Sequence, residues 1–209
     1  MKYILASQSP RRRELLGMLG ITFDIEPATG EERQVGTTPQ EIVRNLASAK
    51  ASEIAAHHTG EDVTVIGADT IVVCGGEILG KPKDRADMER MIRMLSGRTH
   101  EVYTGVAICR AAGAVSGTDG IRTFAECTRV HFYPMSEEEI AAYVAHSDGM
   151  DKAGAYGIQS DAAIYISGIE GDYQNVVGLP VARLYHELRE MAEGNGIEYH
   201  CHFPVDPLR

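Results

Sequence analysis

Runs of apolar residues predict the strands of this chain. Residues 3–6 form an apolar run with the length of a short buried strand. Residues 63–73 are apolar on both sides of a Gly-Ala-Asp-Thr sequence and predict a longer strand, and Gly75 and Gly76 then predict a turn. The glycine-rich residues 111–120 predict a lengthened hairpin loop. Residue composition predicts strands in three further ranges: 101–110, 121–132 and 162–169.

Apolar residues at helical spacing, preceded by capping residues, predict the helices. Ser9 can cap a helix whose first residue is Pro10, because its hydroxyl can accept a hydrogen bond from a free N–H of the first turn. Gly20 is expected to end that helix. The last helix is expected over residues 180–192. Because strands and helices mix along the chain, the predicted fold class is α/β. Three more helices are expected after N-caps, the first and third with capping boxes: Thr38, Asp84 and Ser136.

Composition and charge narrow the classes of function. The chain has 209 residues, of which 44% are apolar, so we expect residues 1–209 to form a single domain. The net charge of −10 argues against nucleic acid as a partner, because that affinity rests on a broad basic surface. No apolar run reaches the roughly 20 residues of a membrane span and no signal peptide is recognised, so no membrane partner is expected.

The cysteines form no redox or zinc motif. They are scattered and lack the C-x-x-C spacing, which favours reduced thiols and a cytoplasmic location. The stretch His200-Cys201-His202 invites a metal site, but two rings flanking one thiol project poorly onto one ion. We favour a structural or terminal role for this stretch.

Polar and basic residues gather between the first strand and the first helix. The cluster contains Ser7, Ser9, Arg11 and Arg12. A helix N-terminus carries a partial positive charge, so arginines there oppose the helix dipole. A bound anion would remove this conflict, and helix starts commonly bind phosphate. The cluster therefore predicts a phosphate site, with a solvated basic turn as the alternative.

Periodicity does not explain several other charged residues. Asp69, followed by Thr70, stands inside an apolar strand, where a carboxylate needs a metal or a basic partner. Lys81 and Lys83 lie in the proline-containing loop after the turn, and residues 151–159 combine an Asp-Lys pair with glycines. Each segment alone is compatible with an exposed loop, and the chain lacks the P-loop pattern G-x-x-x-x-G-K-[ST]. Three further charged residues complete the set: Glu31, Glu32 and Lys50.

Taken in order, these segments resemble the Maf family of nucleoside triphosphate pyrophosphatases over nearly the whole chain. Within the family, the chain resembles the branch that acts on dTTP and UTP. That branch has arginine after the serine-proline pair, threonine after the motif aspartate and glutamine at the end of "AYGIQ", here Arg11, Thr70 and Gln159. The motifs that carry the resemblance are "SQSPRRRELL" (7–16), "GADTIVV" (67–73), "ILGKPKD" (78–84), "LSGRTHEVYTGVA" (95–107), "DKAGAYGIQ" (151–159) and "YQNVVGLPV" (173–181).

The chain departs from the family pattern at two places near the fifth motif. The family commonly has Ser-Gly-Glu-Pro before this motif, whereas residues 146–150 here contain no proline, so we expect a less rigid loop. Ser160 stands where the family usually has glycine. Neither departure removes a charged group, so the expected activity is unchanged.

The resemblance implies a fold and partners. It implies an elongated, mixed and strongly twisted sheet with flanking helices, in two lobes around a cleft, similar to inosine triphosphatases. It also implies a nucleoside triphosphate as the substrate and a homodimer as the assembly.

The resemblance further implies hydrolysis between the α- and β-phosphates, which yields a nucleoside monophosphate and pyrophosphate. Asp69 would accept the proton of the attacking water, and with Glu32 it would bind a divalent cation, Mg²⁺ or alternatively Mn²⁺. Arg11, Thr70 and Gln159 would read the pyrimidine edge. The phosphates would be held by Ser7, Ser9, Arg12, Lys50, Lys81 and Lys83.

Two alternative functions stay open. A nucleotide-binding regulator of cell division without turnover could use the same fold, but it would have little reason to keep Asp69 in an apolar strand. The same chemistry on 7-methyl-GTP or another modified nucleotide is the second alternative. The residues at the three specificity positions argue against it.

Overall fold

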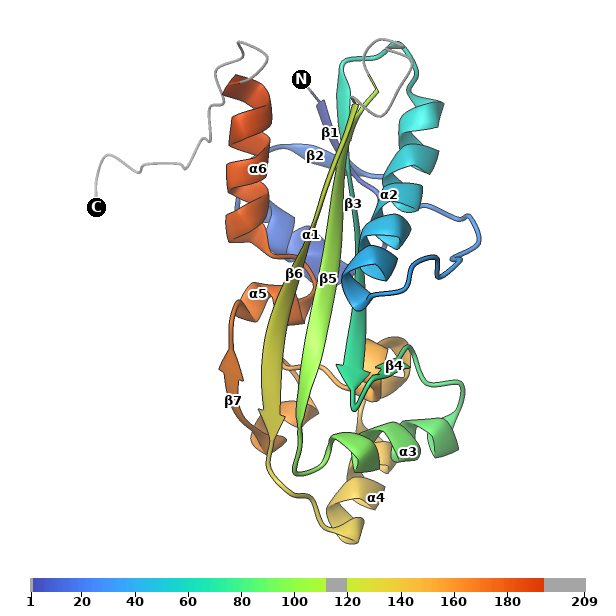
Figure 1. The fold of residues 1–209 in the computed structure, drawn as a ribbon, viewed down its shortest axis with the longest axis vertical. Helices are drawn as coiled ribbons and strands as arrows, with labels where there is room; N and C mark the ends of the chain where they lie inside the picture. Colours follow the sequence, from blue (N-terminus) through green and yellow to red (C-terminus); the bar gives the residue numbers. More distant parts are fainter. Residues whose placement is uncertain (1, 112–119, 194–209) are drawn as a thin grey trace, which may run out of the picture.

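A computed structural model describes residues 2–111 and 120–193 of the chain. It contains an elongated mixed sheet with helices along its faces, so the predicted α/β class is confirmed (Figure 1). Within the described residues the sheet has seven strands, in the order β2-β1-β3-β5-β6-β7, with β4 paired to β3. The strands are β1 (Lys2–Leu5), β2 (Phe23–Ile25), β3 (Val63–Cys74), β4 (Glu77–Leu79), β5 (Thr99–Arg110), β6 (Ile121–Phe132) and β7 (Ile166–Glu170).

The helices begin at the capping residues that the sequence predicts. The Ser9 hydroxyl accepts the Arg12 N–H, and the Asp84 carboxylate accepts the Asp87 N–H. Both capping boxes, at Thr38 and Ser136, have their two reciprocal hydrogen bonds. The helices are α1 (Pro10–Gly17), α2 (Pro39–His57), α3 (Arg85–Leu95), α4 (Glu137–His146), α5 (Tyr173–Val177) and α6 (Val181–Glu193).

Strand register places the central polar residues side by side. β1 pairs in parallel with β2 and β3, and the other strand pairs of the described sheet are antiparallel. Across β3 and β5, Asp69 lies opposite Gly105 and Thr70 lies opposite Thr104. Both pairs lie midway along the long strands, between the two ends of the molecule (Figure 1).

Separate apolar clusters fill the two ends of the sheet. At one end, Met88 of α3 and Ile140 of α4 belong to a single cluster. At the other end, Leu16 of α1 and Leu184 of α6 pack on one sheet face, while Ile54 of α2 packs on the other. These last two clusters use alternate residues of β3 and β5, which point to opposite faces. The predicted arrangement of two lobes is confirmed (Figure 1).

Two glycines allow α2 to approach the sheet closely. A Cβ atom at Gly67 of β3 would overlap the carbonyl oxygen of Ala47, and one at Gly105 of β5 would overlap that of Val43. Any larger residue would push the helix away from the strands. These glycines therefore set the distance between α2, which carries Lys50, and the middle of β3.

One strand prediction is wrong in part. Residues 162–169 do not form one strand, because Asp161–Tyr165 is a 3₁₀ helix and β7 begins at Ile166. The N–H of Ala163 bonds to the carbonyl of Ser160, which turns the chain where the apolar composition suggests extension. The short elements β2, β4 and α5 escape sequence analysis because three to five residues carry no periodic signal.

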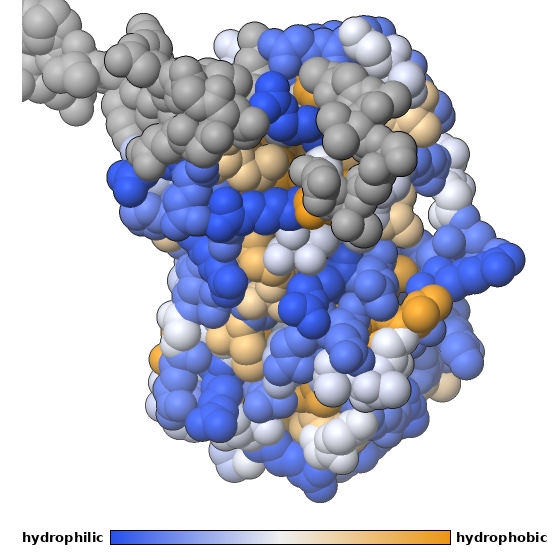
Figure 2. Space-filling model, turned by 45° about the horizontal axis from the view of Figure 1, so that its top comes forward, coloured by the Kyte–Doolittle hydropathy of each residue, from blue (hydrophilic) through white to orange (hydrophobic). Residues whose placement is uncertain are grey.

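The described residues on the face drawn in Figure 2 are mainly polar. Hydrophilic residues cover most of the face drawn in Figure 2, and apolar residues appear there in small separate patches. None of the helices within residues 2–111 and 120–193 combines the length and apolar character that crossing a membrane requires. The predictions for residues 111–120 and for His200-Cys201-His202 concern residues 112–119 and 194–209, which lie outside the described parts of the chain.

Candidate active site

A cavity of about 890 Å³ opens beside the middle of β3. Its volume lies within the range of small-molecule sites in proteins, about 300–1,000 Å³. Segments that are distant in sequence line it, from the start of α1, from α2, β3, the loop after β4 and residues 148–160. Ten of the residues predicted from the sequence line this cavity: Ser7, Ser9, Arg11, Arg12, Glu32, Lys50, Asp69, Thr70, Lys81 and Gln159.

A lysine joins two carboxylates at one side of the cavity. The Lys50 ammonium lies 2.5 Å from Oδ1 of Asp69 and 2.7 Å from Oε1 of Glu32. Asp69 is largely buried in the middle of β3, and Lys50 is the basic partner that its position requires. The hydrogen bond from Lys50, followed by its positive charge, holds the pKa of Glu32 below its usual range. This group carries two negative charges against one positive charge.

The Asp69 and Glu32 carboxylates fit the donor set of a magnesium ion. Because both reach the same Lys50 nitrogen, they converge on one small region of the cavity. Mg²⁺ prefers oxygen ligands and usually takes one or two carboxylates, with water and substrate phosphates completing its shell. Within the described ranges, no three histidine, cysteine, aspartate or glutamate side chains are grouped to hold a metal, so water and substrate oxygens would supply the remaining ligands.

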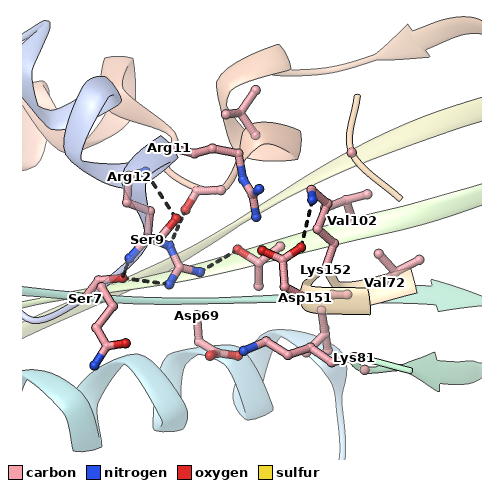
Figure 3. A pocket seen from close by; sticks show the side chains of 18 of the residues that line it. Ser7, Ser9, Arg11, Arg12, Asp69, Val72, Lys81, Val102, Asp151 and Lys152 are labelled. Carbon is pink, nitrogen blue, oxygen red and sulfur yellow. Dashed lines mark hydrogen bonds and ion pairs between the residues drawn. The ribbon is translucent and has the colours of Figure 1, made fainter. Parts of the chain in front are cut away.

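Arg12 lies at the other side, where α1 meets the sheet (Figure 3). Its Nε donates to the carbonyl of Gly178 at 2.9 Å, Nη1 donates to the Ser7 hydroxyl at 3.4 Å, and Nη2 donates to Oγ1 of Thr70 at 3.0 Å. Burial lowers the pKa of Arg12. The neighbouring Arg11 directs its guanidinium into the cavity (Figure 3). Two guanidinium groups therefore face the space that Asp69 borders.

The two lysines of the predicted phosphate loop are placed differently. Lys81 lines the cavity with an exposed side chain (Figure 3). Lys83 is not among the described residues that line it, and its backbone N–H donates to Asp87 at 3.1 Å near the start of α3. The structure thus brings Lys81, but not Lys83, to the other basic residues.

Lys152 is a site residue to which sequence analysis gave no role. Its side chain is only 6% exposed, and its ammonium bonds to the carboxylates of Asp148 and Asp151 at 2.8 and 2.7 Å and to the Asp148 carbonyl at 2.7 Å. All three residues line the cavity. The only sequence signal was the charge pair within the glycine-rich residues 151–159.

The two departures from the family pattern meet in this loop. Ser160 donates to Oδ1 of Asp148 at 3.3 Å, so the residue that replaces the usual glycine bonds to the segment that lacks the usual proline. A Cβ atom at Gly149 would overlap the carbonyl oxygen of Ala155, so any larger residue at position 149 would require a shift of the backbone. Hydrogen bonds and close packing thus connect the segment in which a less rigid loop was expected.

Comparisons with known proteins find relatives over most of the chain. Residues 2–191 match the family described as Maf-like protein. The dTTP/UTP pyrophosphatase of Agathobacter rectalis is 51% identical over 199 residues, which cover 90% of this chain and 96% of that protein. The dTTP/UTP pyrophosphatase of Bacillus cytotoxicus is 48% identical over 195 residues, which cover 92% of this chain and 97% of that protein.

A solved structure shares the fold at low sequence identity. The Staphylococcus aureus Ham1 protein matches with a TM-score of 0.50 and 13% identity, over 93% of this chain and all of that chain. This likeness concerns the fold alone.

Proposed function

The chain belongs to the Maf family, and from this membership we propose that it hydrolyses dTTP and UTP to the nucleoside monophosphate and pyrophosphate. Relatives named for this activity are about half identical to it over most of its length. The observation that carries the proposal is the cavity in which Arg12, Lys50 and Lys81 surround the partly buried carboxylate of Asp69. Positive charge next to a carboxylate suits the hydrolysis of a polyanion.

Neutralisation of the phosphates is the first task of this site. A triphosphate repels an attacking water oxygen, so catalysis of phosphoryl transfer consists mainly of positioning and charge stabilisation. Arg12 and Lys81 come from opposite sides of the cavity, and Ser7 and Ser9 add hydroxyl groups. Lys50 lines the same cavity, so it is placed to exchange a carboxylate for a phosphate oxygen when the substrate binds.

Asp69 is the proposed proton acceptor. It would take a proton from the water that attacks the α-phosphorus, the bond to the bridging oxygen would break, and pyrophosphate would leave. Together with Glu32, it would also hold Mg²⁺, with Mn²⁺ as the alternative. When bound, the cation would neutralise charge on the phosphates.

We assign base selection to other residues that line the cavity. Arg11 and Gln159 line it, and they can present a guanidinium and an amide to the two carbonyl oxygens and the N–H of uracil or thymine. Thr70 also lines the cavity. A site that pairs polar groups discriminates strongly, because a wrong base leaves those groups unpaired.

Pyrophosphate release measured on a panel of triphosphates tests the proposal. The panel contains dTTP, UTP, CTP, ATP, GTP and 7-methyl-GTP, each with and without Mg²⁺. We expect fast release from dTTP and UTP. Nucleotide binding without turnover would favour the regulator of cell division, and fastest release from 7-methyl-GTP would favour a modified nucleotide as the substrate.

From the family resemblance we also propose that the protein is a cytoplasmic homodimer. Light scattering of the purified protein tests whether it is a dimer.

A further inference from the structure

Two threonine hydroxyls connect Arg12 to the interior of the sheet. Thr70 of β3 and Thr104 of β5 are register partners, and their Oγ1 atoms lie 2.9 Å apart. Thr104 is fully buried, and Thr70 is half-buried at the cavity wall. Oγ1 of Thr70 accepts a hydrogen bond from Nη2 of Arg12, and Oγ1 of Thr104 lies 3.0 Å from the carbonyl oxygen of Asn175.

The chemistry of these groups fixes the direction of each hydrogen bond. A carbonyl oxygen can only accept, so the one hydroxyl proton of Thr104 is donated to Asn175. Thr104 must then accept from Thr70, which uses the only proton of Thr70. Since a guanidinium can only donate, the chain runs in one direction, from Arg12 through Thr70 and Thr104 to Asn175.

Helix α5 and the residue after it hold both ends of this series of hydrogen bonds. The side-chain amide of the buried Asn175 donates to the carbonyl of Val102 and to the Thr128 hydroxyl, each at 3.0 Å. Gly178, just after α5, accepts the Nε–H of Arg12. The same short helix therefore holds the end of the hydroxyl chain and one edge of the guanidinium.

Arg12 keeps donors for a ligand in this arrangement. A guanidinium has five N–H groups, and in the described residues three of them point to Gly178, Ser7 and Thr70. Two remain for an anion in the cavity that Arg12 lines, which matches the two-point recognition of phosphate by arginine.

A hydroxyl in this chain is a poor reader of pyrimidine bases. The Thr70 proton is already donated to Thr104, so Thr70 cannot donate to a carbonyl oxygen of uracil or thymine. Its remaining capacity is as an acceptor, so on the edge of uracil it could pair with the N–H alone, and both carbonyl oxygens need other donors. Thr70 therefore differs from Arg11 and Gln159, although all three stand at positions that distinguish the family branches.

We propose that Thr70 and Thr104 are positioning residues that orient the Arg12 guanidinium toward the phosphates, and that they support the turnover of every nucleotide equally. The inference rests on the proposed pyrophosphatase function. It assigns the threonine at position 70 to the phosphate end of the substrate rather than to its base.

We call the hydrogen-bonded series Arg12–Thr70–Thr104–Asn175 the relay. Replacing Thr104 by valine tests it, because Thr104 is not one of the described residues that line the cavity and so should not contact the substrate. T104V keeps the shape and removes the hydroxyl. We expect kcat/KM to fall about tenfold for UTP, dTTP and CTP alike, because Thr70 loses the acceptor that fixes its hydroxyl, and with it the orientation of Arg12. The UTP to CTP ratio should stay within about twofold of the parent value, and T104S should restore activity.

Two further measurements separate the relay from a general structural effect. In an R12K background, T104V should change kcat/KM by less than about twofold, since a lysine has no fork to orient. The matched control is T64V, which removes a buried hydroxyl on the neighbouring strand β3 that has no hydrogen-bond partner among the described residues. T64V should keep the parent kcat/KM.

Binding of inorganic tripolyphosphate, measured by calorimetry, tests the relay without turnover. This ligand has no base, so a tenfold weaker affinity of T104V and T70V supports the relay. Parent-like affinity of both variants would overturn it, as would a changed UTP to CTP ratio in T104V or an undiminished T104V effect in the R12K background. Failure of the parent to hydrolyse any triphosphate would overturn the proposed function instead, while the binding result would still decide the relay.

Discussion

At the level of single residues, the site depends on three charged side chains that the fold brings together, those of Asp69, Lys50 and Glu32. Asp69 stands in an apolar strand, and its nearest compensating charge, Lys50, comes from a helix on the sheet face. Glu32 lies on the other side of that lysine, with most of its side chain exposed. Removing any member changes the charge of the whole group, so each role can be tested by a substitution that preserves shape.

Asp69→Asn should remove turnover and leave the fold intact. Loss of the proposed proton acceptor and metal ligand should lower kcat about a thousandfold or more, which corresponds to about 4 kcal/mol of barrier. Glu32 still pairs with Lys50, so folding should persist. Pyrophosphate release and circular dichroism measure the two effects. Asp24→Asn, an exposed carboxylate on β2, is the control, and near-normal turnover of the Asp69 variant would contradict both roles.

A chelator should abolish the activity of the parent protein. The two carboxylates that converge on Lys50 suit a divalent cation, and the substrate phosphates would complete its coordination. Activity titrated with Mg²⁺ after EDTA treatment measures this requirement. Glu32→Gln should raise the Mg²⁺ concentration for half-maximal rate. Full activity in excess EDTA would show that arginines and lysines suffice.

Gln159→Ala should weaken the choice of base. The amide would lose its bonds to the pyrimidine edge, so kcat/KM for UTP should fall by the equivalent of about 1–3 kcal/mol, while CTP should lose less. Steady-state kinetics on UTP and CTP give the two values. Gln40→Ala, on the exposed first turn of α2, is the matched control. An equal loss on both substrates would remove Gln159 from base selection.

At the scale of elements, the segment of residues 148–160 forms one wall of the cavity. Lys152 connects it internally, because its buried ammonium bonds to both Asp148 and Asp151. Its hydrogen bond lowers the pKa of Asp148. Ser160 bonds to the same Asp148 and follows Gln159 directly, so the position of Gln159 depends on these contacts.

Lys152→Met should loosen this wall. The methionine fills the volume of the stem, but the hydrogen bonds of the ammonium are lost, so the free energy of unfolding should fall by about 1–3 kcal/mol. Both carboxylates are mostly exposed and stay hydrated, which limits the loss. Urea unfolding measures the stability, and UTP kinetics measure the effect on Gln159. Lys83→Met, an exposed lysine, is the control; equal stabilities of the two variants would contradict the assignment.

On the scale of the whole molecule, one buried histidine links stability to pH. His100 is 1% exposed, and its Nε2 lies 2.7 Å from the Tyr156 hydroxyl, while its ring packs edge-on against Phe132. Burial, with a smaller effect of His131, lowers the pKa of His100 to about 4. The unfolded chain, with its ordinary histidine pKa, binds the proton more readily between about pH 6.5 and 4.

Stability should therefore fall as the pH drops through this window. The contribution of His100 is fully present above about pH 6.5 and is lost toward pH 4, by about 3 kcal/mol in total. Urea unfolding at pH 7, 5.5 and 4 measures the loss. His100→Phe should flatten the dependence by this amount, whereas His146→Asn, at an exposed position, should not. An unchanged pH dependence of the His100 variant would contradict the assignment.

Features that depend on neighbours along the chain can be predicted from local sequence. Ser9, Thr38, Asp84 and Ser136 mark helix starts correctly, because each cap bonds to an N–H group three residues later. Most of the site residues that the family resemblance implies line the cavity. Lys83 was implied as well, because sequence spacing does not show which way a loop turns.

Contacts between polar groups distant in sequence depend on the tertiary packing and cannot be predicted from local sequence. Arg12 reaches Gly178 across 166 positions of sequence, and the pairing of Thr70 with Thr104 follows from strand register. Lys50 reaches Asp69 because α2 packs closely on the sheet, which no local pattern encodes. Such contacts arise from the packing of apolar faces distant in sequence, so the direction of the hydrogen bonds at Thr70 became visible only once the sheet was assembled.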